Sequence, residues 1–417
     1  SGIVLEKEFY ANNQSFFEKC KSPLLLVDNS LLALQQWASY YHSLYKPFDI
    51  CITGSNGKTT TKEMIAHLLK LNYHILKSRG NYNNEIGVPL TLLTLKSHHN
   101  VLVMEMAAQR VGEIKELTKM VKPDIAVITN VGEAHIGLFG TKTNIAREKS
   151  EIITALKDKG TAILNRDDSY FDYFCEQISP GLEVIDYGLH PGARVRAENI
   201  KQEKEGGIHF DLILEDNQTH QAFISLSGKF NIYNTLAAIC VAIKMNIPIN
   251  KIVQRIAFFK GLPMHMEYRS LGRGVTLVQD YYNANPTAMK EALNSVEIIS
   301  EGRYKVAVLG DMLELGDQAP DYHREIGKFA AKLSFNMIIG FGEYGNFIIQ
   351  GAEEEGIKRE NISHFHREER QKLAIQLEDT VPDNSIVLLK GSRNMQMEKI
   401  VRYWLEKEKT KGGSFHV

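Results

Sequence analysis

The 417-residue chain has few cysteines, no long apolar run and almost no net charge. Its four cysteines lie far apart without a CxxC pair, which argues against a zinc site and a disulfide framework. No stretch approaches the ~18 consecutive apolar residues of a membrane span, and no signal-peptide pattern is present. With 49 basic against 50 acidic residues, nothing predicts a nucleic-acid partner. We therefore expect a cytoplasmic protein with ordinary globular domains.

Short apolar runs alternate with amphipathic stretches, which is typical of an α/β protein with a mainly parallel sheet. Up to residue 164, strands are expected at 49–53, 101–106, 125–129 and 162–164, with helices at 58–71 and 112–120. Residues 195–226 alternate like antiparallel strands and precede a helix at 234–244. A second strand-to-helix rhythm follows, with strands at 276–279, 306–309, 337–339 and 386–389.

This rhythm predicts a P-loop ATPase-type domain over residues 46–262 and a Rossmann-like α/β domain over residues 263–417. The aperiodic stretch 261–273 is interpreted as the linker between them. Residues 1–45 are too few for a domain of their own.

A strand runs directly into the glycine-rich segment ITGSNGKTTT at 52–61, and a helical pattern follows. Glycines let backbone N–H groups converge on phosphate at a helix N-terminus, while a lysine and a hydroxyl serve the terminal phosphates and Mg²⁺. The fit to GxxxxGK[ST] is imperfect, since Ile52 occupies the first glycine position. The alternative is a glycine-rich turn that only caps a helix. The predicted nucleotide-binding residues are Gly54, Ser55, Asn56, Gly57, Lys58, Thr59 and Thr60.

Polar residues also cluster where other predicted strands end. These are the segment 81–87 (NYNNEIG), Glu105, the segment 129–135 (TNVGEAH) and the segment 146–151 (AREKSE). Ligands of open α/β sheets bind at the carboxyl ends of the strands. Singly, a glutamate or histidine is more often a solvated or structural residue, but their shared location predicts that Thr59, Glu105 and His135 converge on one metal–phosphate site.

Six ordered segments carry a resemblance to a known family: GSNGKTTTKEM, NYNNEIGVPLTLL, ITNVGEAHIGLFGT, DYYNANPTAM, VLGDMLELG and KGSRNMQMEKIV. The chain resembles the Mur ligase family, whose shortened loop TG-x-NGKT is matched by residues 53–59. Within that family it is most similar to the ligases that join D-alanyl-D-alanine to UDP-N-acetylmuramoyl-tripeptide. The resemblance implies ATP-dependent amide-bond formation through an acyl phosphate, in peptidoglycan precursor synthesis.

The resemblance also implies roles for particular residues. Lys58, His135 and Lys149 would be catalytic. Thr59 and Glu105 would hold one Mg²⁺, and His135 a second. Lys149 would be carbamylated and act as a further metal ligand, although sequence alone describes it as an ordinary lysine on a helix surface.

Asn234 would contact adenine, and Arg269 and Asp280 the phosphates and ribose. Phe230 stands where the family usually has histidine, so a polar role at that position is in doubt. The implied substrate residues are Asn81, Asn83, Asn84, Glu85, Ser392 and Arg393. Asp311 and His323 are candidates for the dipeptide side, with capping and salt bridges as an equal alternative. Asn283 and Asn285 are expected to shape a strand-to-helix turn.

Family members of this type open with a domain that binds the uridine diphosphate of the substrate. Only the first ~45 residues resemble its end, so we expect a fragment of a longer enzyme. The expected partners are UDP-muramoyl-tripeptide and D-alanyl-D-alanine, and the expected state is a monomer. Two alternatives remain open: a folylpolyglutamate synthetase-like ligase, and a non-catalytic ATP-binding remnant that acts through partners.

Overall fold

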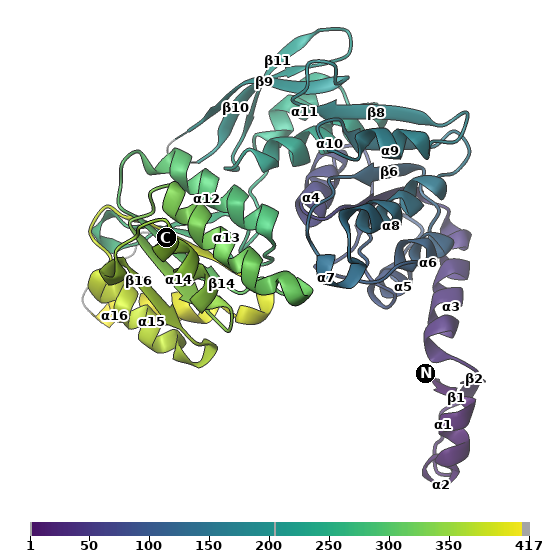
Figure 1. Ribbon diagram of the computed structural model, residues 1–417. Coiled ribbons are helices and arrows are strands. Elements are labelled where there is room, and N and C mark those ends of the chain that lie inside the picture. The colour runs from purple at the N-terminus through teal and green to yellow at the C-terminus, as the bar shows by residue number, and fades with distance from the viewer. Residues whose placement is uncertain (1, 204–205, 411–417) are drawn as a thin grey trace.

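The computed structural model describes residues 2–203 and 206–410. Figure 1 shows an N-terminal arm that projects from a central α/β unit, and a second α/β unit that follows it. The arm contains a two-stranded parallel sheet, β1 (Ile3–Glu6) and β2 (Leu24–Val27), with the short helices α1 (Lys7–Asn12) and α2 (Gln14–Phe17) between them. Helix α3 (Ser30–Tyr45) leads from the arm to the central unit.

The central sheet orders its described strands β11-β10-β9-β8-β7-β6-β3-β5-β4. Pairing is parallel from β4 to β9 and antiparallel for β9, β10 and β11, as the sequence predicts. The strands are β3 (Phe48–Thr53), β4 (Ile75–Lys77), β5 (Val101–Glu105), β6 (Ile125–Ile128), β7 (Thr161–Asn165), β8 (Glu183–Gly188), β9 (Val195–Gln202), β10 (Ile208–Ile213) and β11 (Thr219–Ile224).

Helices cover both faces of this sheet, so β3 is buried almost throughout. Alternate residues of a strand point to opposite faces: Ile50 and Ile52 join one core cluster and Cys51 the other. The first face carries α4 (Lys58–Leu69), α10 (Phe230–Lys244) and α11 (Ile249–Ile256). The second carries α5 (Gly87–Leu92), α6 (Glu113–Met120), α8 (Lys142–Thr154) and α9 (Phe171–Glu176). The short helix α7 (Ile136–Phe139) precedes α8.

The second sheet has the order β12-β13-β17-β14-β15-β16 and is parallel except for β12 against β13. Its strands are β12 (Glu267–Ser270), β13 (Thr276–Asp280), β14 (Lys305–Gly310), β15 (Met337–Phe341), β16 (Ile362–Phe365) and β17 (Ile386–Lys390). Helices α12 (Pro286–Ser300), α13 (Ala319–Lys332) and α14 (Gly345–Glu354) pack on one face. Helices α15 (Arg370–Thr380) and α16 (Glu398–Thr410) pack on the other. This confirms the Rossmann-like α/β prediction.

Two expectations need correction. The stretch 261–273 is not all linker, because residues 267–270 form the edge strand β12, which hydrogen-bonds to β13. An exposed edge strand does not need alternating apolar and polar residues, so its sequence lacks the period-2 pattern by which strands are recognised. Helix α10 begins at Phe230 rather than at Asn234.

Candidate active site between the two sheets

The phosphate loop joins β3 to α4, and its two glycines are required by close packing. Gly54 and Gly57 have φ of +152° and +79°. A Cβ at Gly54 would lie 1.8 Å from Thr129 Oγ1, and one at Gly57 would lie 2.1 Å from Asn234 Oδ1. Any other residue would clash at either position, so the sequence pattern GSNG follows directly from this turn.

The loop is held by the end of β6. Asn130 O accepts a hydrogen bond from Ser55 N at 2.9 Å, and Asn130 Oδ1 accepts one from Asn56 N, also at 2.9 Å. Thr129 Oγ1 donates to Asn56 O at 2.6 Å. Helix α4 begins at Lys58, so the N–H groups of its first turn have no partner within the helix. This helix N-terminus is suited to bind phosphate.

Lys58 lies in the cleft that opens at this loop. Its Nζ donates to Gly54 O at 2.7 Å and to Ser55 O at 3.1 Å. Burial lowers the pKa of Lys58, and the negative charge of Glu105 opposes that shift. Its amine therefore sits in a weakly solvated place where an incoming phosphate would be strongly attracted.

Glu105 is the last residue of β5, and only one of its two carboxylate oxygens accepts a hydrogen bond. Its Oε1 accepts from Asn83 Nδ2 at 2.8 Å, whereas the buried Oε2 has no hydrogen-bond partner. The nearest cation is Lys62 Nζ, 3.6 Å from Oε2. A buried carboxylate oxygen without a donor is a position where a hard cation fits.

Lys149 lies on α8 and is 8% exposed. Burial lowers its pKa to about 7, and the charge of Lys58 contributes in the same direction. Among the residues that the structure describes, its Nζ has no hydrogen bond or ion pair. A near-neutral amine in this position is nucleophilic at physiological pH.

His135 occupies the left-handed region with φ of +63°, directly before α7. Its Nδ1 contacts the carboxylate of Glu314, which follows β14 in the second unit, and this bond lowers the pKa of Glu314. The predicted metal ligand therefore joins the two units here. Within residues 2–203 and 206–410, no three His, Cys, Asp or Glu side chains gather as a metal cluster.

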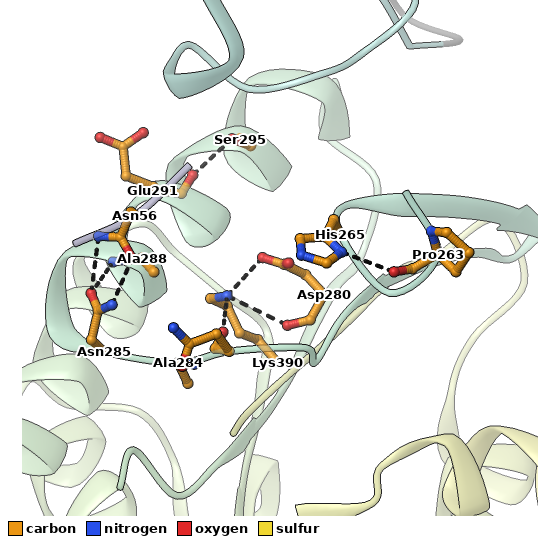
Figure 2. A network of polar contacts seen from close by, with 11 residues as sticks. Asn56, Pro263, His265, Asp280, Ala284, Asn285, Ala288, Glu291, Ser295 and Lys390 are labelled. Atoms are coloured by element: carbon orange, nitrogen blue, oxygen red, sulfur yellow. Dashed lines mark hydrogen bonds and ion pairs between the residues drawn. The ribbon is translucent and has the colours of Figure 1, made fainter. Parts of the chain in front are cut away.

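The second unit faces the phosphate loop with a buried ion pair and an aromatic pair. Lys390 Nζ donates to Asp280 Oδ2 at 2.8 Å and to Asn283 O at 3.0 Å (Figure 2). His265 packs on Tyr282 with ring centroids 4.6 Å apart, and burial lowers the pKa of His265. Arg269, predicted to reach phosphate, is exposed on β12 and does not line the cleft.

The residues expected near adenine and the dipeptide are largely engaged with the protein. Asn234 is buried, donating to Asn231 Oδ1 at 3.1 Å and lying 3.4 Å from Thr61 Oγ1. Asp311 accepts the backbone N–H groups of Glu343 and Tyr344 at 2.9 Å each. His323 Nε2 accepts from Met312 N at 2.9 Å. Neither Asp311 nor His323 lines the cleft, which favours the structural alternative for both.

The two units enclose a cleft of about 740 Å³. Ser392, which accepts from Leu313 N at 3.2 Å, and Arg393, which pairs with Glu398 at 2.8 Å, line its far side. Gly54, Lys149 and Arg269 are not among the lining residues. The predicted residues that do line it are Ser55, Asn56, Gly57, Lys58, Thr59, Thr60, Asn81, Asn83, Asn84, Glu85, Glu105, His135, Asn234, Asp280, Ser392 and Arg393.

The cleft residues to which sequence reasoning assigned no role include His265, Glu314 and Lys390. Lys390 immediately precedes the GSR segment, so its place at the end of a buried strand was a usable signal. Glu314 lies inside the LGDMLELG segment, but its partner His135 is 179 residues away and no spacing connects them.

A phosphate loop facing a second Rossmann-like unit across one cleft is the architecture of an ATP-dependent ligase, and two family models match it. Residues 52–242 match the Mur ligase middle domain, and residues 265–393 match the Mur ligase glutamate ligase domain. A UDP-N-acetylmuramoyl-tripeptide–D-alanyl-D-alanine ligase from Bacillus subtilis is 34% identical over 385 residues, 92% of this chain and 81% of the relative. The chain belongs to the Mur ligase family.

Two solved structures place it further within that family. MurF from Acinetobacter baumannii superposes with a TM-score of 0.85 at 30% identity, covering 93% of this chain and 83% of that one. MurF from Thermotoga maritima in complex with ADP gives 0.84 at 25% identity, covering 99% and 96%. Within the family, the protein therefore groups with the UDP-N-acetylmuramoyl-tripeptide–D-alanyl-D-alanine ligases.

Proposed function

We propose that the protein is an ATP-dependent ligase that joins D-alanyl-D-alanine to UDP-N-acetylmuramoyl-tripeptide in peptidoglycan precursor synthesis. The observation that carries this proposal is the single cleft shared by the phosphate loop and by Asp280, Lys390 and Arg393 of the second unit. One side suits a nucleoside triphosphate, and on the other side Arg393, which pairs with Glu398, is proposed to bind a substrate carboxylate. ATP and a nucleotide-linked peptide are cytoplasmic substrates, so we place the activity in the cytoplasm, carried out by a monomer.

The reaction has two steps. A tripeptide carboxylate oxygen attacks the γ-phosphorus of ATP, which breaks the bond to the β-phosphate oxygen and releases ADP. The dipeptide amine then attacks the resulting acyl phosphate, loses a proton, and expels phosphate as the amide forms. Lys58 and the amides at the start of α4 offset the negative charge of the first step, in which two anions must approach each other.

Mg²⁺ would be held by the Thr59 hydroxyl and Glu105, with a second ion at His135 and Lys149. The Oε2 of Glu105, which accepts no hydrogen bond, fits this role, since oxygen ligands suit Mg²⁺. Bound there, Mg²⁺ would neutralise charge on the phosphates.

An imidazole is an unusual Mg²⁺ ligand, so a second site needs another hard oxygen donor. Lys149 supplies it if its neutral amine adds CO₂, releasing one proton and leaving an anionic carbamate. The pKa of about 7 favours this addition, because a substantial fraction of the amine is neutral near pH 7.

Asn81, Asn83, Asn84 and Glu85 are proposed to contact the peptide-bearing substrate. The loop that carries them lines the cleft beside Glu105. Asn84 is partly committed, because its Oδ1 accepts from Gly87 N at 2.9 Å at the start of α5. Asn234 and Asp280 are proposed to serve the nucleoside. His265 is a better-placed linker residue for this role than Arg269, because it lies in the cleft.

Phosphate release measured with the full chain tests the proposal. We expect release only when ATP, UDP-muramoyl-tripeptide and D-alanyl-D-alanine are all present, and none with folate plus glutamate. Release without peptide and dipeptide would contradict ligase activity. Release with folate plus glutamate would instead support a folylpolyglutamate synthetase-like reaction.

A further inference from the structure

The phosphate loop touches the second unit through one pair of amide side chains, 229 residues apart in sequence. Asn285 Nδ2 donates to Asn56 Oδ1 at 2.7 Å, and Asn56 Nδ2 lies 3.4 Å from Asn285 Oδ1. Figure 2 shows the two side chains facing each other. Asn285 is 2% exposed, whereas Asn56 is half-buried at the cleft, so the bond is partly shielded from water. A hydrogen bond is worth more in such a place than in open solvent.

Asn285 also begins α12. Its Oδ1 accepts from Ala288 N at 3.0 Å, and Pro286 occupies the first helical turn. Asn, Asp and Ser cap helices about equally well. Capping alone therefore does not require an amide, whereas donating to Asn56 does. The helix start fixes the position of Asn285 and leaves its Nδ2 for the phosphate loop.

Asn56 uses its backbone groups inside the central unit. Its N–H donates to Asn130 Oδ1, and its carbonyl accepts from Thr129 Oγ1 and from Asn130 Nδ2 at 3.1 Å. Only its side chain reaches across the cleft. Because Asn56 directly precedes Gly57 and Lys58, a shift of Asn56 would move the groups that face phosphate.

Other contacts between the units attach elsewhere. Thr287 Oγ1 donates to Glu133, and Gly137 N donates to Glu314 O at 3.1 Å, both beyond β6. Among the described residues, no other hydrogen bond joins residues 54–58 to the second unit. The Asn56–Asn285 pair therefore links the nucleotide-binding loop itself to α12.

We propose that Asn285 is a positioning residue that holds the phosphate loop in its binding shape through Asn56. The second unit thereby prepares the loop before nucleotide arrives. Without this bond, bound nucleotide must itself order the loop, at a cost in affinity.

Hydrogen–deuterium exchange on the nucleotide-free full chain tests this without any assumption about activity. The variant Asn285→Ser keeps a capping hydroxyl but cannot reach Asn56. In this variant we expect the backbone amides of Ser55 and Asn56 to exchange about three- to tenfold faster than in the wild type. This is the size of effect expected from the loss of one hydrogen bond. The amides of α12 should exchange as in the wild type. Asn29→Ser is the matched control, because Asn29 caps α3 through Leu32 N at 2.7 Å, far from the cleft.

Unchanged loop exchange in Asn285→Ser would overturn the proposal. So would equal acceleration across α12 and the loop, because that result would mean general loosening of the second unit. Acceleration in Asn29→Ser would have the same meaning.

A kinetic measurement, which rests on the proposed ligase function, adds a second readout. We expect the KM for ATP to rise about three- to tenfold in Asn285→Ser, with kcat within twofold of wild type. Asn56→Ala combined with Asn285→Ser should raise KM no more than Asn56→Ala alone. Additive effects would overturn the proposal. A wild-type chain without turnover would instead contradict the ligase function and leave the exchange result intact.

Discussion

Buried charged side chains differ between the two ends of the central sheet in how completely the protein itself pairs them. At the amino ends of the strands, Asp49 is fully buried and fully paired. Its carboxylate contacts His42 Nε2 at 2.8 Å and Lys157 Nζ at 2.9 Å, and Lys157 also reaches Asp124 at 2.8 Å. At the carboxyl ends, Glu105 Oε2 accepts no hydrogen bond and has only Lys62 Nζ, 3.6 Å away, as an ionic neighbour among the described residues. No hydrogen bond or ion pair joins Lys149 Nζ to the described residues.

This difference separates structural charge from charge kept for a ligand. A buried ion without a partner costs several kcal/mol, so a chain retains one only where something else compensates. At the amino ends, His42 and Lys157 complete the pairing of Asp49, and this cluster ties α3 to β3. At the carboxyl ends the missing partners would be phosphate, metal and CO₂. Glu105, whose Oε2 accepts no hydrogen bond, thus lies at the end of the sheet that carries the phosphate loop, whereas the fully paired Asp49 lies at the other end.

The largest effect is expected from removing the unpaired lysine. Lys149→Ala should lower the ligation rate about 1000-fold, the upper range for losing one electrostatic group in an active site. ADP affinity, measured by calorimetry, should stay within about fivefold, because the phosphate loop is untouched. Lys149→Arg should be equally inactive, since a guanidinium cannot form a carbamate. Added acetate should restore part of the activity of Lys149→Ala by supplying a carboxylate.

The paired lysine at the other end of the sheet is the matched control. Lys157→Ala should keep ligation within about threefold of wild type, because the charged groups that Lys157 contacts in the described part of the chain are Asp49 and Asp124. Full ligation activity in Lys149→Ala, or an equal loss of activity in Lys149→Ala and Lys157→Ala, would contradict the claim that Lys149 serves the reaction and Lys157 the structure.

A smaller effect, on stability, is expected from breaking the paired cluster. Asp49→Asn should lower the free energy of unfolding by about 2 kcal/mol in a urea titration. This is less than the loss of a fully buried pair, because Lys157 is partly exposed and keeps Asp124 as a partner. The exposed pair Lys7–Asp28 provides a comparison, and Asp28→Asn should change stability by less than about 0.5 kcal/mol. Equal effects at both positions would show that burial does not distinguish them.

Sequence reasoning placed the proposed site residues at one edge of the sheet because parallel strands bring their carboxyl ends together. Lys58, Glu105 and His135 each follow a short apolar run, and that rule places them at one edge without knowledge of any contact. Lys149 was harder to interpret, because helical spacing alone does not reveal that its side chain is buried.

The exposed position of Arg269 and the second contact of Asn285 depend on information that no local pattern contains. The family resemblance implies a phosphate contact for Arg269, but the edge strand β12 leaves its side chain exposed and outside the cleft. Asn285 was predicted to shape a turn, and it does cap α12. Its bond to Asn56 depends on how two separately folded units meet, and neither spacing nor periodicity records that arrangement.

The smallest expected effect concerns the pH dependence of stability. It arises from His323, a buried histidine in the second unit whose two ring nitrogens both have hydrogen-bond partners. His323 accepts from Met312 N and contacts Ala319 O at 2.6 Å, so its ring must be neutral, and burial lowers its pKa to about 4. An unfolded chain has a histidine pKa near 6.5 and binds the proton first as pH falls. Stability is therefore retained above about pH 6.5 and is lost progressively towards pH 4.

Between pH 6.5 and 5.5, the free energy of unfolding should fall about 1 kcal/mol more in wild type than in His323→Gln. Parallel curves for wild type and His323→Gln would show that this imidazole does not couple folding to pH.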